Sequence, residues 1–424
     1  SSLRPTPELS YAVRTLGCSG GIMITASHNP REYNGFKVYD ETGCQLTPDK
    51  IAKVLPYIAK WPHELDLIIS VSAAQQSLIK VIDTVVDDAY LSDLRKIHFR
   101  AHDPKAIKVV FTPQHGTAYP ILVNLLTGQG YEIHCVEDQC TPDPDFSHTL
   151  SPNPEEHKAY DEAIALAKTI DADLVLSTDP DADRMGIVVK QGDEYVYLTG
   201  NQGGSILQEF IYSALRDENR MPEHPVDNEK TLTGFKYIGS KIAQYDQTKA
   251  KHFVFGYEES YGYLIQPIVR DKDALQACLV LCEAACYYKQ HGKTLVDVLN
   301  QLYATYGTYY ETQTSVSYSG ASGAEKIQAI LSAFRNTPLQ SLAGIKVIGA
   351  EDYLSGKHTG EATWTLDLPR ENVLKYFLED GSWVAIRPSG TEPKCKFYFC
   401  VKGRDEAEAQ AKFNALSTSV TQVY

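Results

Sequence analysis

Residues 172–189, which read ADLVLSTDPDADRMGIVV, decide the fold of this chain. The apolar run at 172–177 is typical of a buried strand, and the apolar residues of 155–170 recur at helical spacing just before it. Strands are also predicted at 107–111 and 131–136. Strands that alternate with helices indicate an α/β framework in which helices cover parallel sheets.

The same alternation extends over most of the chain. Strands are predicted at 21–25 and 36–39, and helices at 203–218 and 273–292. From about residue 313 the pattern changes to half-solvated strands, followed by a closing helix, which is typical of an α+β unit with an antiparallel sheet. We therefore expect four domains, with boundaries at 1–83, 84–195, 196–312 and 313–424.

The composition limits the class of partner. The chain has 424 residues, 43% of them hydrophobic and 22% charged, as in globular proteins with an ample core. A net charge of −14 argues against nucleic acid or an anionic membrane surface as the main partner. If the substrate is an anion, the positive charge that binds it must be concentrated in a few loops.

The cysteines point to packing. The chain has nine, and Cys278, Cys282 and Cys286 are spaced four apart, so they share one face of the helix predicted at 273–292. A metal site is one interpretation, but without a CxxC pair a buried apolar stripe is favoured. The longest apolar stretch is too short to span a bilayer. We therefore expect a reduced, cytoplasmic protein.

Three aspartates, Asp179, Asp181 and Asp183, directly follow the strand at 172–177. In an extended chain, residues two apart point to the same side, so these carboxylates would repel one another without a cation. Oxygen ligands in a compact loop suit Mg²⁺, and ligands of α/β sheets gather at the carboxyl ends of strands. The alternatives are a solvated acidic turn and an EF-hand calcium loop, whose expected Gly and Glu are missing here.

Two further loops carry groups that suit a phosphorylated sugar. IRPSGTEPK, residues 386–394, offers a guanidinium, hydroxyls, an ammonium and backbone N–H groups to a phosphate, although it could be an ordinary turn. FGYEESYGY, residues 255–263, places Glu258 and Ser260 where they could bind sugar hydroxyls, although it could be a tyrosine-rich loop. The candidate phosphate ligands are Arg387, Ser389, Gly390, Thr391 and Lys394.

Two single residues are candidates for the chemistry. Ser27 lies in GIMITASHNP, residues 21–30, between an apolar run and a turn at Asn29-Pro30. An unactivated serine is a poor nucleophile, and no His-Asp pair adjoins it in the sequence. Lys272, between two aspartates, is a candidate proton carrier, although a salt-bridged surface lysine is the commoner outcome.

Four motifs in this order resemble the α-D-phosphohexomutase superfamily: TASHNP at 25–30, DPDADR at 179–184, GYEES at 256–260 and RPSGTEPK at 387–394. The similarity begins at LRPTPEL, residues 3–9, and is nearest to the bacterial phosphoglucomutase branch, which includes phosphomannomutases and phosphopentomutase-like members. It implies four domains around a central cleft, three of α/β type and a C-terminal one of different topology. Members of the family normally begin with a further segment whose Gly- and Arg-bearing strand lines the cleft, and we expect this chain to lack that part of the first domain.

The resemblance also implies roles for residues. Ser27 would be phosphorylated, and His28 and Lys272 would flank the chemistry as general acid or base. The metal site would comprise Ser27, Asp179, Asp181 and Asp183. Glu258 and Ser260 would hold sugar hydroxyls. The phosphate that is not being transferred would be held by Arg387, Ser389, Gly390, Thr391 and Lys394.

The activity implied by the resemblance is an intramolecular phosphotransfer that interconverts hexose 1-phosphate and hexose 6-phosphate, with glucose as the hexose. It would proceed through a phosphoserine enzyme and a bisphosphate, with Mg²⁺ as cofactor and glucose 1,6-bisphosphate as activator. Mannose or pentose phosphates are alternative substrates. A metal-dependent phosphatase and a non-catalytic phosphosugar-binding protein are alternatives of another class. We expect a monomer or weak dimer.

Overall fold

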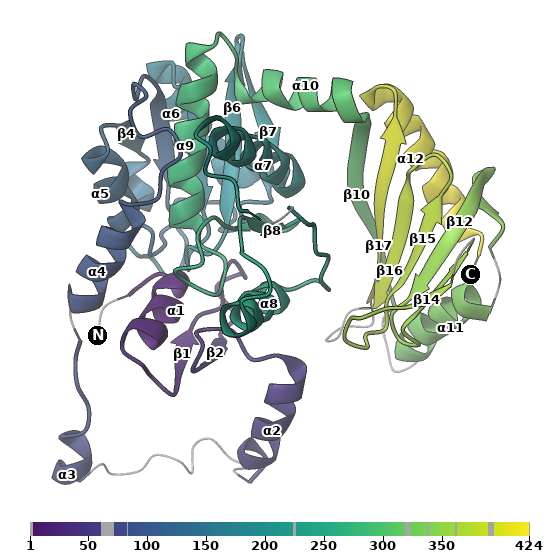
Figure 1. Ribbon diagram of the computed structural model, residues 1–424, viewed down its shortest axis with the longest axis horizontal. Coiled ribbons are helices and arrows are strands. Elements are labelled where there is room, and N and C mark those ends of the chain that lie inside the picture. The colour runs from purple at the N-terminus through teal and green to yellow at the C-terminus, as the bar shows by residue number, and fades with distance from the viewer. Residues whose placement is uncertain are drawn as a thin grey trace. The chain divides into compact units, whose positions relative to one another are not determined.

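The computed structural model describes residues 3–60, 72–82, 84–223, 226–318, 323–336, 339–360, 363–388 and 394–423. The chain forms two compact units, Ser1–Leu299 and Asn300–Tyr424, both drawn as ribbons in Figure 1. Each unit has a sheet and a hydrophobic core of its own. Within the described residues, no helix combines the length and the apolar character that crossing a membrane requires.

A five-stranded sheet in the order β4-β3-β5-β6-β7 forms the centre of the first unit (Figure 1). β3, β4 and β5 are parallel, as the sequence predicts, whereas β6 and β7 are antiparallel. The six residues between β5 and β6 are too few for a crossover connection, so the chain has to reverse its direction. The strands are Lys108–Thr112 (β3), Glu132–Cys135 (β4), Leu174–Thr178 (β5), Met185–Gln191 (β6) and Glu194–Leu198 (β7).

Helices cover both faces of this sheet. α6, Asp161–Ile170, packs its alanines against one face, where a 3₁₀ turn at His157–Tyr160 replaces the first part of the predicted helix. α9, Ala274–Gln290, lies on the other face, beside β5 and β6. Side chains of β3, β5 and β6 alternate between the two helices, as they must in strands. The residues that pack with α6 are Val110, Val175 and Val188.

α9 confirms the interpretation of the cysteines. Asp273 is its N-cap residue, whose carboxylate accepts hydrogen bonds from the backbone N–H groups of Leu275 and Gln276. Almost all of the helix is buried, and three of its buried residues are the cysteines spaced four apart. They are Cys278, Cys282 and Cys286. Their thiols are therefore part of the packing of this helix.

The first residues of the chain form a helix and a hairpin. α1 spans Thr6–Thr15, and β1, Gly20–Ile24, pairs antiparallel with β2, Phe36–Asp40. Ile24 lies opposite Phe36, so the loop at 25–35 closes the hairpin. This loop carries Ser27.

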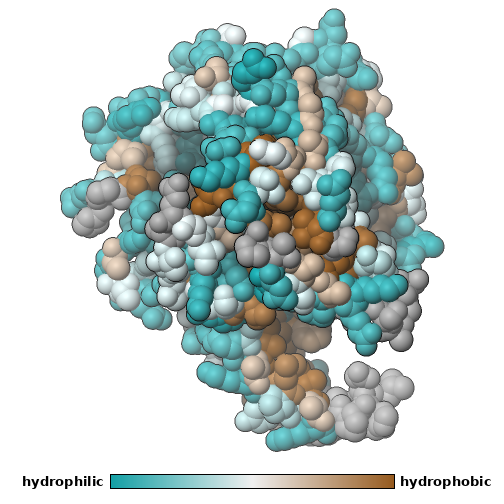
Figure 2. Space-filling view, turned by 90° about the vertical axis from the view of Figure 1, so that its right-hand side faces the viewer, coloured by the Kyte–Doolittle hydropathy of each residue, from teal (hydrophilic) through white to brown (hydrophobic). Residues whose placement is uncertain are grey.

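α2, Pro48–Ile58, has a hydrophobic surface. None of its residues, all of which the structure describes, is buried. The lower part of Figure 2, where α2 lies, shows this hydrophobic surface. The large exposed apolar residues are Ile51, Val54, Leu55, Tyr57 and Ile58.

The rest of the first unit is mainly helical, with a short antiparallel hairpin of β8, Gly256–Glu258, and β9, Gly262–Leu264. The predicted helix at 203–218 is α7, which begins at Gly200. Its other helices in the described residues are α3 (Ala73–Gln76), α4 (Thr84–Leu94), α5 (Ile121–Gly128), α7 (Gly200–Asp217) and α8 (Phe235–Thr248). α10 (Leu295–Tyr306) begins in the first unit and ends in the second.

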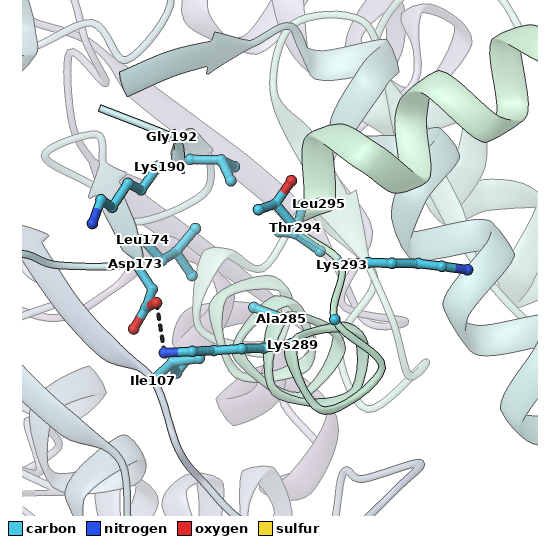
Figure 3. A pocket seen from close by; sticks show the side chains of 12 residues that line it. Ile107, Asp173, Leu174, Lys190, Gly192, Ala285, Lys289, Lys293, Thr294 and Leu295 are labelled. Atoms are coloured by element: carbon cyan, nitrogen blue, oxygen red, sulfur yellow. Dashed lines mark hydrogen bonds and ion pairs between the residues drawn. The ribbon is translucent and has the colours of Figure 1, made fainter. Parts of the chain in front are cut away.

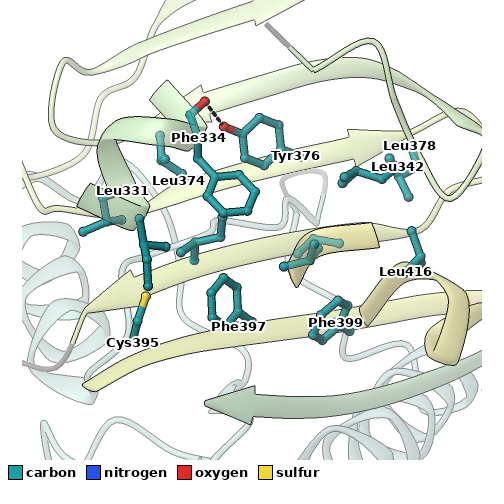
Figure 4. Close-up of a cluster of buried hydrophobic side chains, with 14 of the residues drawn as sticks. Leu331, Phe334, Leu342, Leu374, Tyr376, Leu378, Cys395, Phe397, Phe399 and Leu416 are labelled. Atoms are coloured by element: carbon teal, nitrogen blue, oxygen red, sulfur yellow. Dashed lines mark hydrogen bonds between the residues drawn. The ribbon is translucent and has the colours of Figure 1, made fainter. Parts of the chain in front are cut away.

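In the described residues of the second unit, two helices pack against an antiparallel sheet, as the change of pattern near residue 313 predicts. The strand order is β10-β17-β16-β15-β12-β13-β14, with β11 paired to β12. Residues of the sheet and of both helices form one core, shown in Figure 4. The elements are β10 (Thr308–Ser317), α11 (Gly323–Asn336), β11 (Ser341–Leu342), β12 (Ile345–Asp352), β13 (Lys357–Gly360), β14 (Trp364–Thr365), β15 (Leu374–Leu378), β16 (Trp383–Pro388), β17 (Lys394–Gly403) and α12 (Glu406–Thr421).

Candidate functional site

The three aspartates come together in a tight loop after β5. One oxygen from each of Asp179, Asp181 and Asp183 lies within 4.8 Å of the others, and all three residues are buried. Ala182 has a φ of +59°, which bends the loop. The backbone N–H groups of Asp183 and Arg184 both donate to Asp179 Oδ1 at 3.0 Å, so this side chain also fixes the shape of its own loop.

The carboxylate of Asp181 is held from outside the loop. Its Oδ2 atom accepts hydrogen bonds from the hydroxyls of Thr6 (2.9 Å) and Thr25 (3.2 Å), and it lies 2.7 Å from Lys37 Nζ. The backbone N–H of Thr6 also donates to the Asp181 carbonyl at 2.8 Å. These contacts all use the same oxygen of the carboxylate.

Asp183 is held in the same way by two lysines. Its Oδ2 atom lies 2.6 Å from Lys37 Nζ and 3.1 Å from Lys272 Nζ. Within the described part of the chain, Oδ1 of Asp181 and Oδ1 of Asp183 are buried and accept no hydrogen bond. Buried carboxylate oxygens without a donor are unfavourable unless a cation binds them. The oxygen-rich donor set therefore fits Mg²⁺.

The surrounding charges shift the pKa values of the aspartates in opposite directions. Burial, and then the charges of Asp181 and Asp183, raise the pKa of Asp179 well above its usual range. Burial also acts to raise the pKa of Asp183, but the positive charges of Lys272 and Lys37 outweigh it and hold this pKa well below the usual range. The lysines thus keep Asp183 ionised within a cluster of like charges.

Ser27 lies beside this cluster. Its hydroxyl donates to Asp179 Oδ2 at 3.1 Å, and its backbone N–H donates to Thr25 Oγ1 at 2.8 Å. Ser27 has a φ of +55°, which places it in the left-handed region. His28 Nδ1 is 3.3 Å from Ser27 Oγ. Burial, and then the charge of Arg184, lower the pKa of His28 to about 4, so the ring is neutral at pH 7.

Lys272 is buried, which rules out the alternative of a salt-bridged surface lysine. Besides Asp183, its ammonium faces Asp271 Oδ1 at 3.5 Å and Glu258 Oε1 at 4.0 Å. Burial lowers the pKa of Lys272, but the charges of Asp183 and Asp271 outweigh it and raise the pKa above its usual value. A Cβ at Gly262 would lie 2.1 Å from Lys272 Cδ, so the lysine requires glycine at this point of β9.

The hairpin of β8 and β9 brings the candidate sugar ligands toward the same cluster. Glu258 ends β8 and pairs with Gly262 of β9, so the turn between the strands contains Ser260. Burial raises the pKa of Glu258, with Lys272 and Arg184 acting in the opposite direction. Arg184 itself forms an ion pair with Glu155.

The candidate phosphate ligands lie in the second unit. Arg387 is in β16 and Lys394 begins β17, and the two strands are neighbours in the sheet. Both residues are half-buried. Ser389, Gly390 and Thr391, the other three predicted ligands of this loop, lie outside the described residues.

Sequence reasoning missed Lys37, Thr6 and Thr25. Lys37 is on β2, whose residues become more buried from Phe36 to Asp40, and a lysine in a predicted strand directly after the serine loop was the available signal. The two threonines gave no such signal, because their role depends on contacts with Asp181, more than 150 positions away.

α1 connects two parts of the site. Its first residue, Thr6, binds the aspartate loop, while the hydroxyl of Ser10 accepts the backbone N–H of Arg270 at 2.9 Å. At the other end of the helix, Arg14 Nη1 donates to the carbonyl of Pro267 at 2.9 Å. The segment 267–270 runs directly into Lys272.

A cavity of about 310 Å³ lies elsewhere in the first unit (Figure 3). It is lined by residues from the starts of β3 and β5, whereas the aspartates follow the end of β5. Lys289 Nζ lies 2.7 Å from Asp173 Oδ1, and Lys190 pairs with Asp171, so these two cations already have partners. The cavity is thus separate from the carboxylate cluster.

Comparisons with known proteins agree with this fold and site. Models of the phosphoglucomutase/phosphomannomutase α/β/α domains I, II and III match residues 1–64, 88–192 and 193–306, and the model of the C-terminal domain matches 324–417. A phosphoglucomutase from Staphylococcus aureus is 39% identical over 97% of this chain and 78% of its own length.

Two solved structures share the fold. Parafusin, a phosphoglucomutase from Paramecium, has a TM-score of 0.68 at 19% identity, over 99% of this chain and 81% of its own. A phosphoglucomutase/phosphomannomutase family protein from Burkholderia thailandensis has a TM-score of 0.66 at 16% identity, over 99% and 81%. Fold and site together define a phosphosugar mutase, an isomerase that moves a phosphoryl group.

The chain belongs to the phosphoglucomutase/phosphomannomutase family of the α-D-phosphohexomutase superfamily. It is a hexose phosphate mutase built from four domains, three of α/β type and a C-terminal one with an antiparallel sheet.

Proposed function

We propose that this enzyme interconverts glucose 1-phosphate and glucose 6-phosphate, with Ser27 as the carrier of the phosphoryl group. The observation that carries the proposal is the position of Ser27 Oγ, 3.1 Å from Asp179 Oδ2, beside two buried carboxylate oxygens that accept no hydrogen bond within the described residues. Glucose is favoured over mannose or a pentose because the curated relatives are named phosphoglucomutases.

The reaction consists of two phosphoryl transfers. In the first, the bond from phosphorus to Ser27 Oγ breaks while a bond to the free hydroxyl of the hexose monophosphate forms, which gives glucose 1,6-bisphosphate. The bisphosphate then reorients, and Ser27 takes the other phosphoryl group. Glucose 1,6-bisphosphate therefore also serves as the activator that loads an unphosphorylated Ser27.

Mg²⁺ would be held by Asp179, Asp181, Asp183 and the phosphate on Ser27, where it would neutralise charge on the phosphoryl oxygens. The balance of charges supports this assignment. Lys37, Lys272 and Arg184 lie beside the three carboxylates, and Lys272 and Arg184 also face Asp271, Glu258 and Glu155. A phosphate of nearly two negative charges and a divalent cation added together leave that balance unchanged.

His28 and Lys272 are placed to move protons. His28 is neutral, and its Nδ1 lies 3.3 Å from Ser27 Oγ, so it accepts or returns the proton of this hydroxyl. Lys272 stays charged between Asp183 and Glu258, so it donates a hydrogen bond toward an oxygen of the bound substrate. In the first transfer, the sugar hydroxyl loses a proton when it binds the phosphorus. Ser27 Oγ takes up a proton when its bond to the phosphorus breaks.

The remaining ligands bind the substrate. Glu258 and Ser260 are proposed to hold sugar hydroxyls, which the approach of Glu258 to Lys272 supports. The loop of the second unit is proposed to hold the phosphate that stays in place, since its arginine and lysine supply positive charge on a protein with a net charge of −14. These ligands are Arg387, Ser389, Gly390, Thr391 and Lys394.

A cytoplasmic location belongs to the same proposal. Seven of the nine cysteines are buried as free thiols, which is typical of proteins that fold in a reducing compartment. The domain boundaries at 1–83, 84–195, 196–312 and 313–424, and the monomeric or weakly dimeric state, remain predictions.

One experiment tests the carrier role of Ser27. The protein is incubated with glucose 1,6-bisphosphate and Mg²⁺, and the intact mass is compared with that of the Ser27→Ala variant. We expect the mass of one phosphoryl group on the wild type alone, together with conversion of glucose 1-phosphate to glucose 6-phosphate. Full mutase activity in the alanine variant would contradict the proposal, and release of inorganic phosphate without isomerisation would favour a phosphatase.

A further inference from the structure

The hydroxyl of Thr25 touches both halves of the reaction centre. It accepts a hydrogen bond from the backbone N–H of Ser27 at 2.8 Å and donates one to Asp181 Oδ2 at 3.2 Å. One oxygen atom thus connects the loop that carries the serine with the loop that carries the aspartates, although the two loops are 156 positions apart in the sequence.

The bond to Ser27 stabilises an uncommon backbone conformation. A φ of +55° is rarely adopted by residues other than glycine, asparagine and aspartate, and it persists when the surroundings hold it. Thr25 supplies such a constraint, because a threonine hydroxyl that accepts a hydrogen bond from the backbone N–H two residues later closes a local turn. Without it, we expect the Ser27 hydroxyl to point less often at Asp179.

The bond to Asp181 fixes a carboxylate. Its Oδ2 atom is shared by Thr25, Thr6 and Lys37, which leaves Oδ1 for the cation. Thr6 contacts Asp181 through both its hydroxyl and its backbone N–H, but within the described part of the chain these bonds do not extend to Ser27. The two threonines can therefore be compared directly, because both bind the Asp181 carboxylate but Thr25 also binds Ser27.

We propose that Thr25 is a positioning residue that aligns Ser27 with the divalent-cation site. This inference rests on the proposed function, in which Ser27 carries the phosphoryl group and the aspartates bind the cation. Removal of the Thr25 hydroxyl weakens cation binding and slows phosphoryl transfer to Ser27. Removal of the Thr6 hydroxyl weakens cation binding alone.

The test uses Mn²⁺ as a stand-in for Mg²⁺, because its binding can be followed by electron paramagnetic resonance without turnover. Mn²⁺ affinity is measured for the wild type, Thr25→Val, Thr25→Ser and Thr6→Val. Residues that orient metal ligands typically contribute 10- to 100-fold to metal affinity. We expect a loss of about 10-fold in both valine variants and near wild-type affinity in Thr25→Ser.

The second measurement separates the two threonines. Phosphorylation of Ser27 by glucose 1,6-bisphosphate is followed by intact mass at a Mn²⁺ concentration that saturates each variant. Thr6→Val is then expected to react at the wild-type rate, whereas Thr25→Val stays at least 10-fold slower and Thr25→Ser recovers. A Thr25→Val variant that reacts at the wild-type rate, or binds Mn²⁺ as tightly as the wild type, would overturn the proposal.

Controls distinguish a wrong role for Thr25 from an unfolded variant and from a wrong proposed function. Circular dichroism and thermal unfolding show whether each variant is folded, and Thr25→Ala replaces Thr25→Val if valine unfolds the protein. If the wild type itself binds no Mn²⁺ or takes no phosphoryl group, the proposed function is wrong, whatever the variants do. If the wild type does both and the variants match it, only the role of Thr25 is wrong.

Discussion

At the scale of the residue, the site depends on which oxygen of each carboxylate is already engaged. Hydroxyls and ammonium groups occupy Oδ2 of Asp181 and Asp183, and this arrangement leaves Oδ1 of both without a donor among the described residues. A cation that binds these two buried carboxylate oxygens would supply the favourable contacts that they lack. The effect should be visible as stabilisation of the folded protein.

We therefore predict that Mg²⁺ raises the thermal unfolding midpoint. A ligand that binds only the folded state at about 100 times its Kd contributes about 2.7 kcal/mol. Asp181→Asn should abolish most of this rise, measured by calorimetry with and without Mg²⁺. Asp173→Asn, which alters a carboxylate paired with Lys289 instead, serves as the control. An equal rise in both variants would place the cation elsewhere.

A second prediction concerns Glu8, which is buried in α1. Burial first, and then the hydrogen bond and charge of Asp87, raise the pKa of Glu8 to about 8, although Arg4 acts in the opposite direction. Between pH 4.5 and 8, the folded protein thus binds more protons here than the unfolded chain does. The free energy of unfolding must fall as the pH rises through this window, by about 1.4 kcal/mol per pKa unit.

Glu8→Gln should remove that decrease. Its advantage over the wild type in free energy of unfolding is expected to grow from pH 4.5 to 8 and then level off, as measured by urea unfolding. Glu194→Gln, at the exposed start of β7, serves as the control. A constant difference between Glu8→Gln and the wild type across this range would mean that Glu8 is ionised in the folded state.

At the scale of the element, β6 lies against the turn before α6 with little space. A Cβ at Gly186 of β6 would lie 1.8 Å from Tyr160 Oη and 2.9 Å from Pro154 Cβ. Gly186→Ala should therefore reduce the free energy of unfolding by about 1–3 kcal/mol, as overpacking does. Gly128→Ala in α5, with no neighbouring atom nearer than 3.8 Å, should cost nothing in the same urea titration. Equal stability of the two variants would contradict the packing.

How much the sequence predicts also differs between elements. The helix α9 and the strand β5 were predicted because their burial leaves a clear pattern of apolar residues, and the short loop at 179–184 carried its own signal in three aspartates. The direction of β6 depends on the length of that loop, which periodicity does not report. The burial of Lys272 depends on Asp183 and Gly262, residues that only the folded chain brings close.

At the scale of the whole molecule, the chain has two compact units with separate cores. We predict two transitions in calorimetry, because units with their own cores need not unfold together. Phe397→Ala in the core of the second unit should cost about 3–5 kcal/mol and lower one transition while leaving the other in place. A single transition that shifts as a whole would show that the units unfold as one.

α1 has a consequence for how this enzyme can evolve. Thr6 is attached to the aspartate loop, and Ser10 is attached to the segment that leads into Lys272. The helix therefore fixes the distance and the orientation between the aspartate loop and Lys272. One extra residue inserted between Thr6 and Ser10 would rotate one end against the other by about 100° and misalign both. We therefore expect substitutions at exposed positions of α1 to be tolerated far better than insertions or deletions that change its length.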